Sequence, residues 1–296
     1  RMAKRRVGKF CGFSSVREGK MKTVIELLDG KWEYDYFNLI AKHINVQEDL
    51  DIVFMKWDQD IPKTKNKCIL FVTSDEHHKY HEKFTNHPNV ILTFRNYLPE
   101  QHHPKVKALP LGYLQGFEHE DINFNDRKYD YSFSGTLPDA PCDATRHALK
   151  FSLERLDILE QQYEKFVLFY EGWAKGLTMP EYADVMYNSR VALCPKGYTS
   201  SETFRYFEAA RAGCVIISEP KPDVWFYKDA PHIEIKDWLK LPSVLPSILK
   251  DKDLLNHHHE LTKKWWEEKC SPESVGAYIT RELNKLKFRF RYEGYE

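Results

Sequence analysis

Short apolar runs alternate with segments of helical composition along most of the chain, and this alternation limits the folds open to it. In the first half the runs lie at residues 51–55, 69–73 and 89–93. In the second half they lie at 131–134, 166–169, 191–193 and 214–218, with helix-compatible segments at 143–159, 179–188 and 203–212. Buried strands separated by helices are typical of parallel sheets, because each parallel connection must cross back over the sheet. The sequence therefore predicts an α/β fold with parallel sheets.

The length of the chain predicts more than one domain. Its 296 residues correspond to roughly two domains of about 150 residues each. The stretch 110–130, which contains Pro and Gly, is the best linker candidate, so we expect domains at 1–115 and 116–275. Residues 276–296 are expected to form a helix or tail that packs back on the first domain. Two facing Rossmann-like domains would bind ligands at the carboxyl ends of their strands, in the cleft between them.

Composition excludes some classes of partner. The chain carries 44 basic and 44 acidic side chains, so it lacks the cationic excess of generic nucleic-acid and anionic-membrane binders. No apolar run approaches the roughly 20 residues that span a bilayer, and no signal-peptide core is seen. The six cysteines are scattered, which favours buried free thiols in a reducing, cytoplasmic location over a disulfide framework or a zinc site. These are Cys11, Cys68, Cys142, Cys194, Cys214 and Cys270.

The segment 193–209 is the sharpest functional signal. An expected strand ends at Pro195, a loop rich in Ser and Thr follows, and an expected helix begins. Free backbone N–H groups and the positive end of the helix dipole make such a junction an anion site. Arg205 and Glu208 lie three residues apart on the helix, so one face offers a guanidinium for a diphosphate and a carboxylate for a ribose diol. The alternative is a capping loop with a surface Arg–Glu pair. Neither a P-loop nor a dinucleotide-binding glycine pattern is present.

This segment resembles the donor-binding signature of exostosin-like glycosyltransferases, in which a C-P-x-G loop precedes S/T-x-R-x-x-E-A and a buried strand. Here the matching stretch is residues 194–218. Two shorter blocks resemble the same family: residues 133–136 followed by Arg146, and residues 94–97 with 110–113. Together the blocks are most similar to the ribitol xylosyltransferase branch and its relatives in large DNA viruses such as chloroviruses. The likeness spans approximately residues 68–220, about half of the chain.

The resemblance implies a GT-B fold, with an acceptor domain first and a nucleotide-sugar domain second. It implies an inverting transfer of a sugar, with xylose from UDP-xylose as the best candidate, onto a hydroxyl of a glycan acceptor. UDP-sugar is then a substrate, and no obligatory metal or other cofactor is expected. If the enzyme is viral, the cytoplasm in question is that of the host; a Golgi-lumenal catalytic fragment is disfavoured.

The resemblance also implies roles for individual residues of the donor site. Arg205 would hold the diphosphate and Glu208 the ribose hydroxyls, while the Ser134-Gly135-Thr136 turn approaches the phosphates and Arg146 adds a second cation. Fixed cations and N–H dipoles of this kind stabilise the charge that develops on the leaving diphosphate. The loop residues expected to line the same site are Lys196, Gly197, Tyr198, Thr199, Ser200, Ser201 and Thr203.

Inversion requires a base that deprotonates the acceptor hydroxyl, and we expect it from the first domain. Asp75 is the first candidate and Glu76 the second, because both follow the run 69–73, where a strand would end at the cleft. The alternative is that Ser74 and Asp75 only cap a helix at 75–84. Arg95 is a candidate contact for the acceptor or a phosphate, and its alternative is a surface cation.

Other patterns lead to different function classes. Asp75, His77 and His81 have workable spacing for zinc, which would suit a metallohydrolase, although 13 histidines make such spacing common. Asp58-Gln59-Asp60 matches the short D-x-D pattern that holds Mn²⁺ in GT-A enzymes, but Ile61-Pro62 after it indicates a plain loop. A module that binds a nucleotide sugar or glycan without turnover is the remaining alternative.

Overall fold

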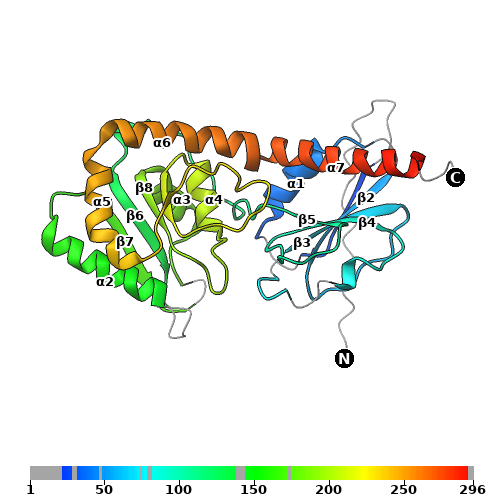
Figure 1. The fold of residues 1–296 in the computed structure, drawn as a ribbon, viewed down its shortest axis with the longest axis horizontal. Helices are drawn as coiled ribbons and strands as arrows, with labels where there is room; N and C mark the ends of the chain where they lie inside the picture. Colours follow the sequence, from blue (N-terminus) through cyan, green and yellow to red (C-terminus); the bar gives the residue numbers. More distant parts are fainter. Residues whose placement is uncertain are drawn as a thin grey trace.

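Two parallel five-stranded sheets form the centres of two lobes that lie side by side (Figure 1). The computed structural model describes residues 22–28, 32–46, 49–73, 75–78, 82–137, 144–172 and 175–292, with side chains up to 286. The first sheet has the order β1-β2-β3-β4-β5, formed by Lys22–Glu26, Leu50–Lys56, Lys67–Thr73, Val90–Arg95 and Val106–Ala108. The second sheet has the order β10-β9-β8-β6-β7, formed by Ile233–Glu234, Val215–Ser218, Ser189–Cys194, Tyr129–Thr136 and Lys165–Tyr170. We call these the first and the second lobe.

The second sheet contains a point where the strand order reverses. The chain runs from β6 out to β7 and then returns to β8 on the other side of β6. In open parallel sheets a ligand crevice forms at such a switch point, outside the carboxyl ends of the two strands. The topology therefore places a ligand crevice after Thr136 and Cys194, the last residues of β6 and β8.

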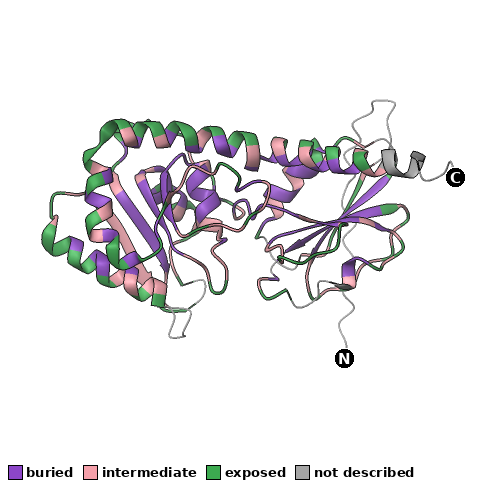
Figure 2. Cartoon of the chain, viewed as in Figure 1, coloured by how far each residue is buried: buried purple, intermediate pink, exposed green. Residues whose placement is uncertain are grey.

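Helices cover both sheets and connect the lobes. In Figure 1, α6 and α7 run across the top of both lobes, joined by the π-helical segment Trp266–Cys270. The outer faces of α2 and α5 are exposed, whereas the central strands are buried (Figure 2). The α-helices are α1 Tyr34–His43, α2 Ala144–Leu159, α3 Met179–Tyr187, α4 Phe204–Arg211, α5 Leu241–Lys250, α6 Lys252–Trp265 and α7 Pro272–Tyr292. Short 3₁₀ helices lie at Glu82–Phe84, Phe124–Asp126 and Trp238–Lys240.

The elements predicted for the second half are confirmed, close to their expected bounds. In α3, Pro180 occupies the first turn, and Thr178 and Glu181 form a capping box. The predicted helix at 75–84 is wrong within the described residues, which form a turn at 75–78 and the short helix Glu82–Phe84. The reason lies partly at His78, whose φ of 55° is left-handed and ends a right-handed helix.

The segment predicted as a linker is buried at its start and exposed over much of the rest. It includes the buried side chains of Leu111, Tyr113 and Phe117, which join one apolar cluster extending from the first sheet to α4 and α6. Gly112 has a φ of 70°, and a Cβ there would lie 2.2 Å from the ring of Tyr36. The Tyr36 hydroxyl in turn donates to the Cys270 carbonyl at 2.7 Å. The connection between the lobes is therefore fixed between α1 and the start of α7.

The C-terminal helix lies against the first lobe. The Asn45 backbone N–H donates to Thr280 Oγ1 at 2.9 Å, and the Tyr278 ring lies 6.3 Å from that of Phe94. Buried free thiols are confirmed at Cys68, Cys194, Cys214 and Cys270; Cys11 and Cys142 lie outside the described residues. Across the described part of the chain, no helix is both long and apolar enough to span a bilayer.

Candidate functional site

The loop between β8 and α4 closes on itself by short-range hydrogen bonds. The Gly197 N–H donates to the Ser200 carbonyl at 2.7 Å, and the Glu202 N–H donates to Ser200 Oγ at 3.0 Å. A Cβ at Gly197 would lie 3.3 Å from both the Ser200 carbonyl and Glu76 Oε1, which is tighter than ordinary contact. The loop thus presents its remaining N–H groups outward, toward the first lobe.

Glu76, the second candidate for the base, binds these N–H groups. Its Oε1 accepts from the backbone N–H groups of Thr199 and Ser200, both at 2.8 Å. Thr199 Oγ1 also donates to the Glu76 carbonyl at 3.3 Å. The loop that was predicted to bind an anion therefore holds one, a carboxylate from the opposite lobe. A diphosphate could use the same two N–H groups only after Glu76 has left them.

Arg205 joins α4 to the end of β6. Its Nη2 and Nε donate to the Ser134 carbonyl at 2.7 and 3.2 Å, and its guanidinium lies 4.7 Å from the centre of the Phe133 ring. A Cβ at Gly135 would lie 2.5 Å from Arg205 Nη2. Only glycine therefore lets the guanidinium lie across this turn, which brings together two blocks that the sequence places 70 residues apart (205 − 135 = 70).

Arg146 links the other two blocks. From α2, its Nη1 donates to the Thr136 carbonyl at 2.7 Å. Its Nη2 and Nε donate to the Lys196 carbonyl at 3.3 and 3.4 Å. The ends of β6 and β8 are thereby held together by a cation at the switch point. The donor residues predicted from the sequence thus gather at one edge of the second sheet.

Glu208 is buried and binds the backbone of the segment that joins the lobes. It is 2% exposed, and its Oε1 accepts from the Leu114 N–H at 3.2 Å. Burial raises the pKa of its carboxyl to about 7, an effect that the Leu114 N–H and the charge of Arg205 oppose. Since neither side chain is exposed, the surface Arg–Glu pair considered as an alternative is not what this helix contains. The role of Glu208 toward a ribose stays a prediction.

Asp75 and Arg95 form one buried ion pair at the ends of β3 and β4. Arg95 Nη2 donates to Asp75 Oδ2 at 2.9 Å. The Arg95 side chain is 1% exposed and the Asp75 side chain 2% exposed. Arg95 also donates to the Asp75 and Asn96 carbonyls, at 3.0 and 3.2 Å. Burial lowers the pKa of Arg95, and the Asp75 partner opposes that shift. The alternative of a surface cation at Arg95 is therefore wrong, and the first candidate base is fixed by the candidate acceptor contact.

Three ionisable residues near this region were not predicted from the sequence. Glu202 is 5% exposed, and burial raises the pKa of its carboxyl to about 7. Burial lowers the pKa of Lys221 to about 8; its Nζ donates to the Ser201 carbonyl at 2.5 Å and lies 4.4 Å from the centre of the Tyr206 ring. Glu33 accepts a short hydrogen bond from the Thr73 hydroxyl, and burial raises its pKa to about 7. For Lys221 the available signal was its place shortly after an apolar strand.

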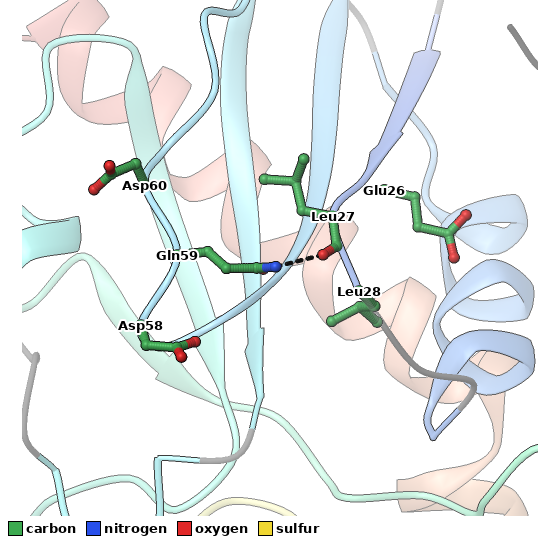
Figure 3. Close-up of a pocket in the computed structure, with 6 residues that line it drawn as sticks. All are labelled: Glu26, Leu27, Leu28, Asp58, Gln59 and Asp60. Carbon is green, nitrogen blue, oxygen red and sulfur yellow. Dashed lines mark hydrogen bonds between the residues drawn. The ribbon is translucent and has the colours of Figure 1, made fainter. Parts of the chain in front are cut away.

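The D-x-D pattern follows β2, at the carboxyl ends of β1 and β2 in the first sheet. Asp58 and Asp60 line an open hollow of about 600 Å³ with Glu26, Leu27, Leu28 and Gln59 (Figure 3). Gln59 Nε2 donates to the Leu27 carbonyl at 2.5 Å, and the two aspartates point in different directions. Lys83 lies 3.2 Å from Asp60 Oδ1. Among the described residues no group of three His, Cys, Asp or Glu side chains is placed to hold a metal ion. His81, part of the zinc alternative, lies outside them.

Known proteins resemble this chain in fold. No protein-family model matches it, and no curated protein matches it in sequence. The structure of HepE from Anabaena in complex with UDP and glucose is similar, with a TM-score of 0.52 and 10% identity over 90% of this chain and 100% of that one. A TarM mutant from S. aureus, in complex with fondaparinux, α-GlcNAc-glycerol and UDP, gives a TM-score of 0.49 and 10% identity over 80% of this chain. The chain spans 55% of the length of that TarM chain.

At 10% identity, these similarities show a shared fold and nothing more. The chain has the predicted GT-B-type α/β fold: two facing Rossmann-like parallel sheets with a helical C-terminal segment.

Proposed function

We propose that the protein is an inverting, metal-independent glycosyltransferase that transfers xylose from UDP-xylose to a hydroxyl of a glycan. The observation that carries the proposal is the group of cations and N–H donors at the switch point of the second sheet. Arg205, Arg146 and the β8–α4 loop converge there from three separate elements. The fold is consistent with it, since HepE, which is similar in fold, was solved with UDP and glucose.

In this proposal the second lobe binds the leaving group. Arg205 and the Thr199 and Ser200 N–H groups stabilise the negative charge that builds on the diphosphate as the bond to the sugar breaks. Glu208 contacts the ribose hydroxyls. The N–H groups become available when Glu76 withdraws, so binding of the nucleotide exchanges one anion for another.

The first lobe supplies the acceptor site and the base. Asp75 takes the proton of the acceptor hydroxyl while that oxygen bonds to the anomeric carbon and the diphosphate departs. Arg95 fixes the orientation of the Asp75 carboxylate through the 2.9 Å ion pair. Replacement of Asp75 by Asn would keep UDP binding and abolish transfer, whereas a module that only binds nucleotide sugars would lose nothing.

A panel of UDP-sugars tests the proposal by thermal unfolding, because a ligand that binds only the folded state raises the midpoint. We expect UDP and UDP-xylose to raise the midpoint of the wild type, and Arg205→Ala to lose most of that rise. Arg190→Ala is the matched control, since Arg190 lies in the same lobe but pairs with Asp130 at 2.8 Å. Absence of any shift with the whole panel would contradict a nucleotide-sugar enzyme.

A further inference from the structure

One buried carboxylate of the β8–α4 loop has no hydrogen-bond partner among the described residues. Asp75 pairs with Arg95, Glu76 accepts two backbone N–H groups, and Glu208 accepts the Leu114 N–H. Within the described residues, the carboxylate of Glu202 has neither a hydrogen bond nor an ion pair, although it is only 5% exposed. Buried polar groups are normally hydrogen-bonded, and a buried carboxylate without a partner is costly. A ligand that carries hydrogen-bond donors would therefore satisfy the Glu202 carboxylate.

The charged and titratable neighbours of Glu202 come from both lobes. Lys221 and Tyr227 belong to the second lobe, and Glu76, Arg95 and Tyr97 to the first. The ammonium of Lys221 donates to the Ser201 carbonyl rather than to Glu202. The charge of Glu202 adds to burial in raising the pKa of Tyr97 and of Tyr227. The loop that carries Glu202 binds Glu76 of the first lobe through Thr199 and Ser200, so Glu202 belongs to the segment where the two lobes meet.

Among the residues that the structure describes, several hydroxyl oxygens of the second lobe are also buried without a hydrogen-bond partner. Two of them are the Tyr227 hydroxyl and Thr203 Oγ1, which does not cap α4 although Thr203 is the residue before that helix. Hydroxyl groups both donate and accept, and ionised carboxylates only accept. The Glu202 carboxylate and these two hydroxyl groups therefore match a ligand that carries several hydroxyl groups.

The position of Glu202 relates it to the sugar end of the nucleotide. In the chain it lies between Ser200, whose N–H already binds a carboxylate, and Arg205. Its own N–H donates to Ser200 Oγ, which holds it against the anion-binding loop. If the diphosphate lies on this loop, the group bonded to its outer phosphate extends toward the first lobe, where the acceptor must approach. Glu202 belongs to this loop, which contacts Glu76 of the first lobe through Thr199 and Ser200.

We propose that Glu202 accepts hydrogen bonds from the hydroxyl groups of the sugar carried by the nucleotide, and that it selects an uncharged sugar over a uronic acid. This inference rests on the proposed function. A site built to bind a hydroxyl rejects a ligand that cannot pair with it, and a buried carboxylate repels a second carboxylate. Glu202 is on this view a specificity-determining residue, separate from the base and from the diphosphate ligands.

UDP-xylose and UDP-glucuronate form a matched pair for the test, because they differ by one carboxylate group. Calorimetry at pH 8 would give the Kd of UDP and of both UDP-sugars for the wild type, Glu202→Gln and Glu202→Ala, with Glu234→Gln as an exposed control in the same lobe. We expect UDP to bind all four proteins within about twofold. Relative to UDP, binding of UDP-xylose should weaken about tenfold or more in Glu202→Ala, as for the loss of a hydrogen bond to a charged group. The preference for UDP-xylose over UDP-glucuronate should fall in Glu202→Gln.

The possible failures are distinguishable. If the Glu202 variants bind UDP normally and keep the preference of the wild type, the role of Glu202 is wrong and the proposed function stands. If the Glu202 variants lose affinity for UDP and for UDP-xylose equally, Glu202 acts on the nucleotide and the inference is again wrong. If the wild type binds neither UDP nor a UDP-sugar, the proposed function is wrong and the inference with it. Unfolding midpoints of the variants separate these results from misfolding.

Discussion

At the scale of single residues, the site depends on a missing side chain as much as on those present. The Arg205 guanidinium reaches the Ser134 carbonyl because Gly135 has no Cβ; one placed there would lie 2.5 Å from Arg205 Nη2 and 2.8 Å from Phe133 Cζ. The Phe133 ring under the guanidinium adds a cation–π contact at 4.7 Å. The position of the cation is therefore set by three consecutive residues of β6 (133–135).

Gly135→Ala tests that dependence. The added methyl group should displace the guanidinium and weaken UDP binding about as much as Arg205→Ala does. In a double-mutant cycle, Gly135→Ala should cost little further affinity once Arg205 is already Ala, because both changes remove the same interaction. Calorimetry would give the Kd of UDP for the wild type, both single variants and the double variant. Additive losses would show that Gly135 acts independently of Arg205.

The Asp75–Arg95 pair predicts a large effect on stability. Arg95→Met should lower the free energy of unfolding by about 3–5 kcal/mol, because it leaves the Asp75 carboxylate buried without its cation. The double variant Asp75→Asn/Arg95→Met removes both charges and should lose less than Arg95→Met alone. Urea unfolding measures both. Equal losses in the single and double variants would show that the two charges are not coupled.

Glu33 predicts a dependence of stability on pH. Its pKa of about 7 in the folded protein exceeds the ordinary 4.5, so between these values the folded state binds more protons than the unfolded state. The contribution of the Glu33 carboxyl to the free energy of unfolding is fully present below about pH 4.5 and is lost as the pH rises through 7. Glu33→Gln should therefore gain stability relative to the wild type with rising pH, by up to roughly 3 kcal/mol. Urea unfolding at pH 5 and pH 8 checks this; a difference that does not change with pH would contradict it.

At the scale of elements, the contact between the turn 75–78 and the β8–α4 loop occupies two N–H groups of the proposed diphosphate site. Glu76→Ala frees the Thr199 and Ser200 N–H groups, so it should raise the affinity for UDP while it lowers stability by about 1–2 kcal/mol. Calorimetry and urea unfolding measure the two effects, and Glu118→Ala, on the surface of the linker, is a control. A fall in UDP affinity would mean that Glu76 shapes the loop rather than competing with the nucleotide.

The elements that the sequence reveals are those with strong local patterns. The runs at 191–193 and 214–218 are continuously apolar because both faces of β8 and β9 are buried, and such runs are recognisable without the fold. β1 was missed because it is an edge strand whose residues are mostly exposed or half-buried. The false helix at 75–84 has helical composition, but the Asp75 carbonyl accepts from Arg95 and His78 turns left-handed. The first of these depends on the end of β4, since Arg95 lies 20 residues further along the chain.

The site was predictable only in part, for a similar reason. Arg205, Gly135 and Arg146 come from a block pattern that can be read along the chain, and the structure gathers them at one edge. The engagement of Glu76 by the opposite loop is different, because it depends on how the two lobes meet. The same holds for Glu202, whose neighbours are spread over both lobes. No spacing in a single sequence encodes either relation.

At the scale of the whole molecule, the backbone passes between the lobes twice, and the two passages touch. The first is the stretch around Gly112 and Tyr113, and the second is the π-helical segment Trp266–Cys270. Tyr36 holds them together: its ring packs under Gly112 and its hydroxyl binds Cys270, while the rings of Tyr113 and Trp266 lie 6.2 Å apart. Both connections between the lobes are therefore held at one place. A movement of the lobes that keeps these contacts would be a rotation about that place. In the proposed function, such a rotation would separate Glu76 from the Thr199 and Ser200 N–H groups and so make them available to the nucleotide.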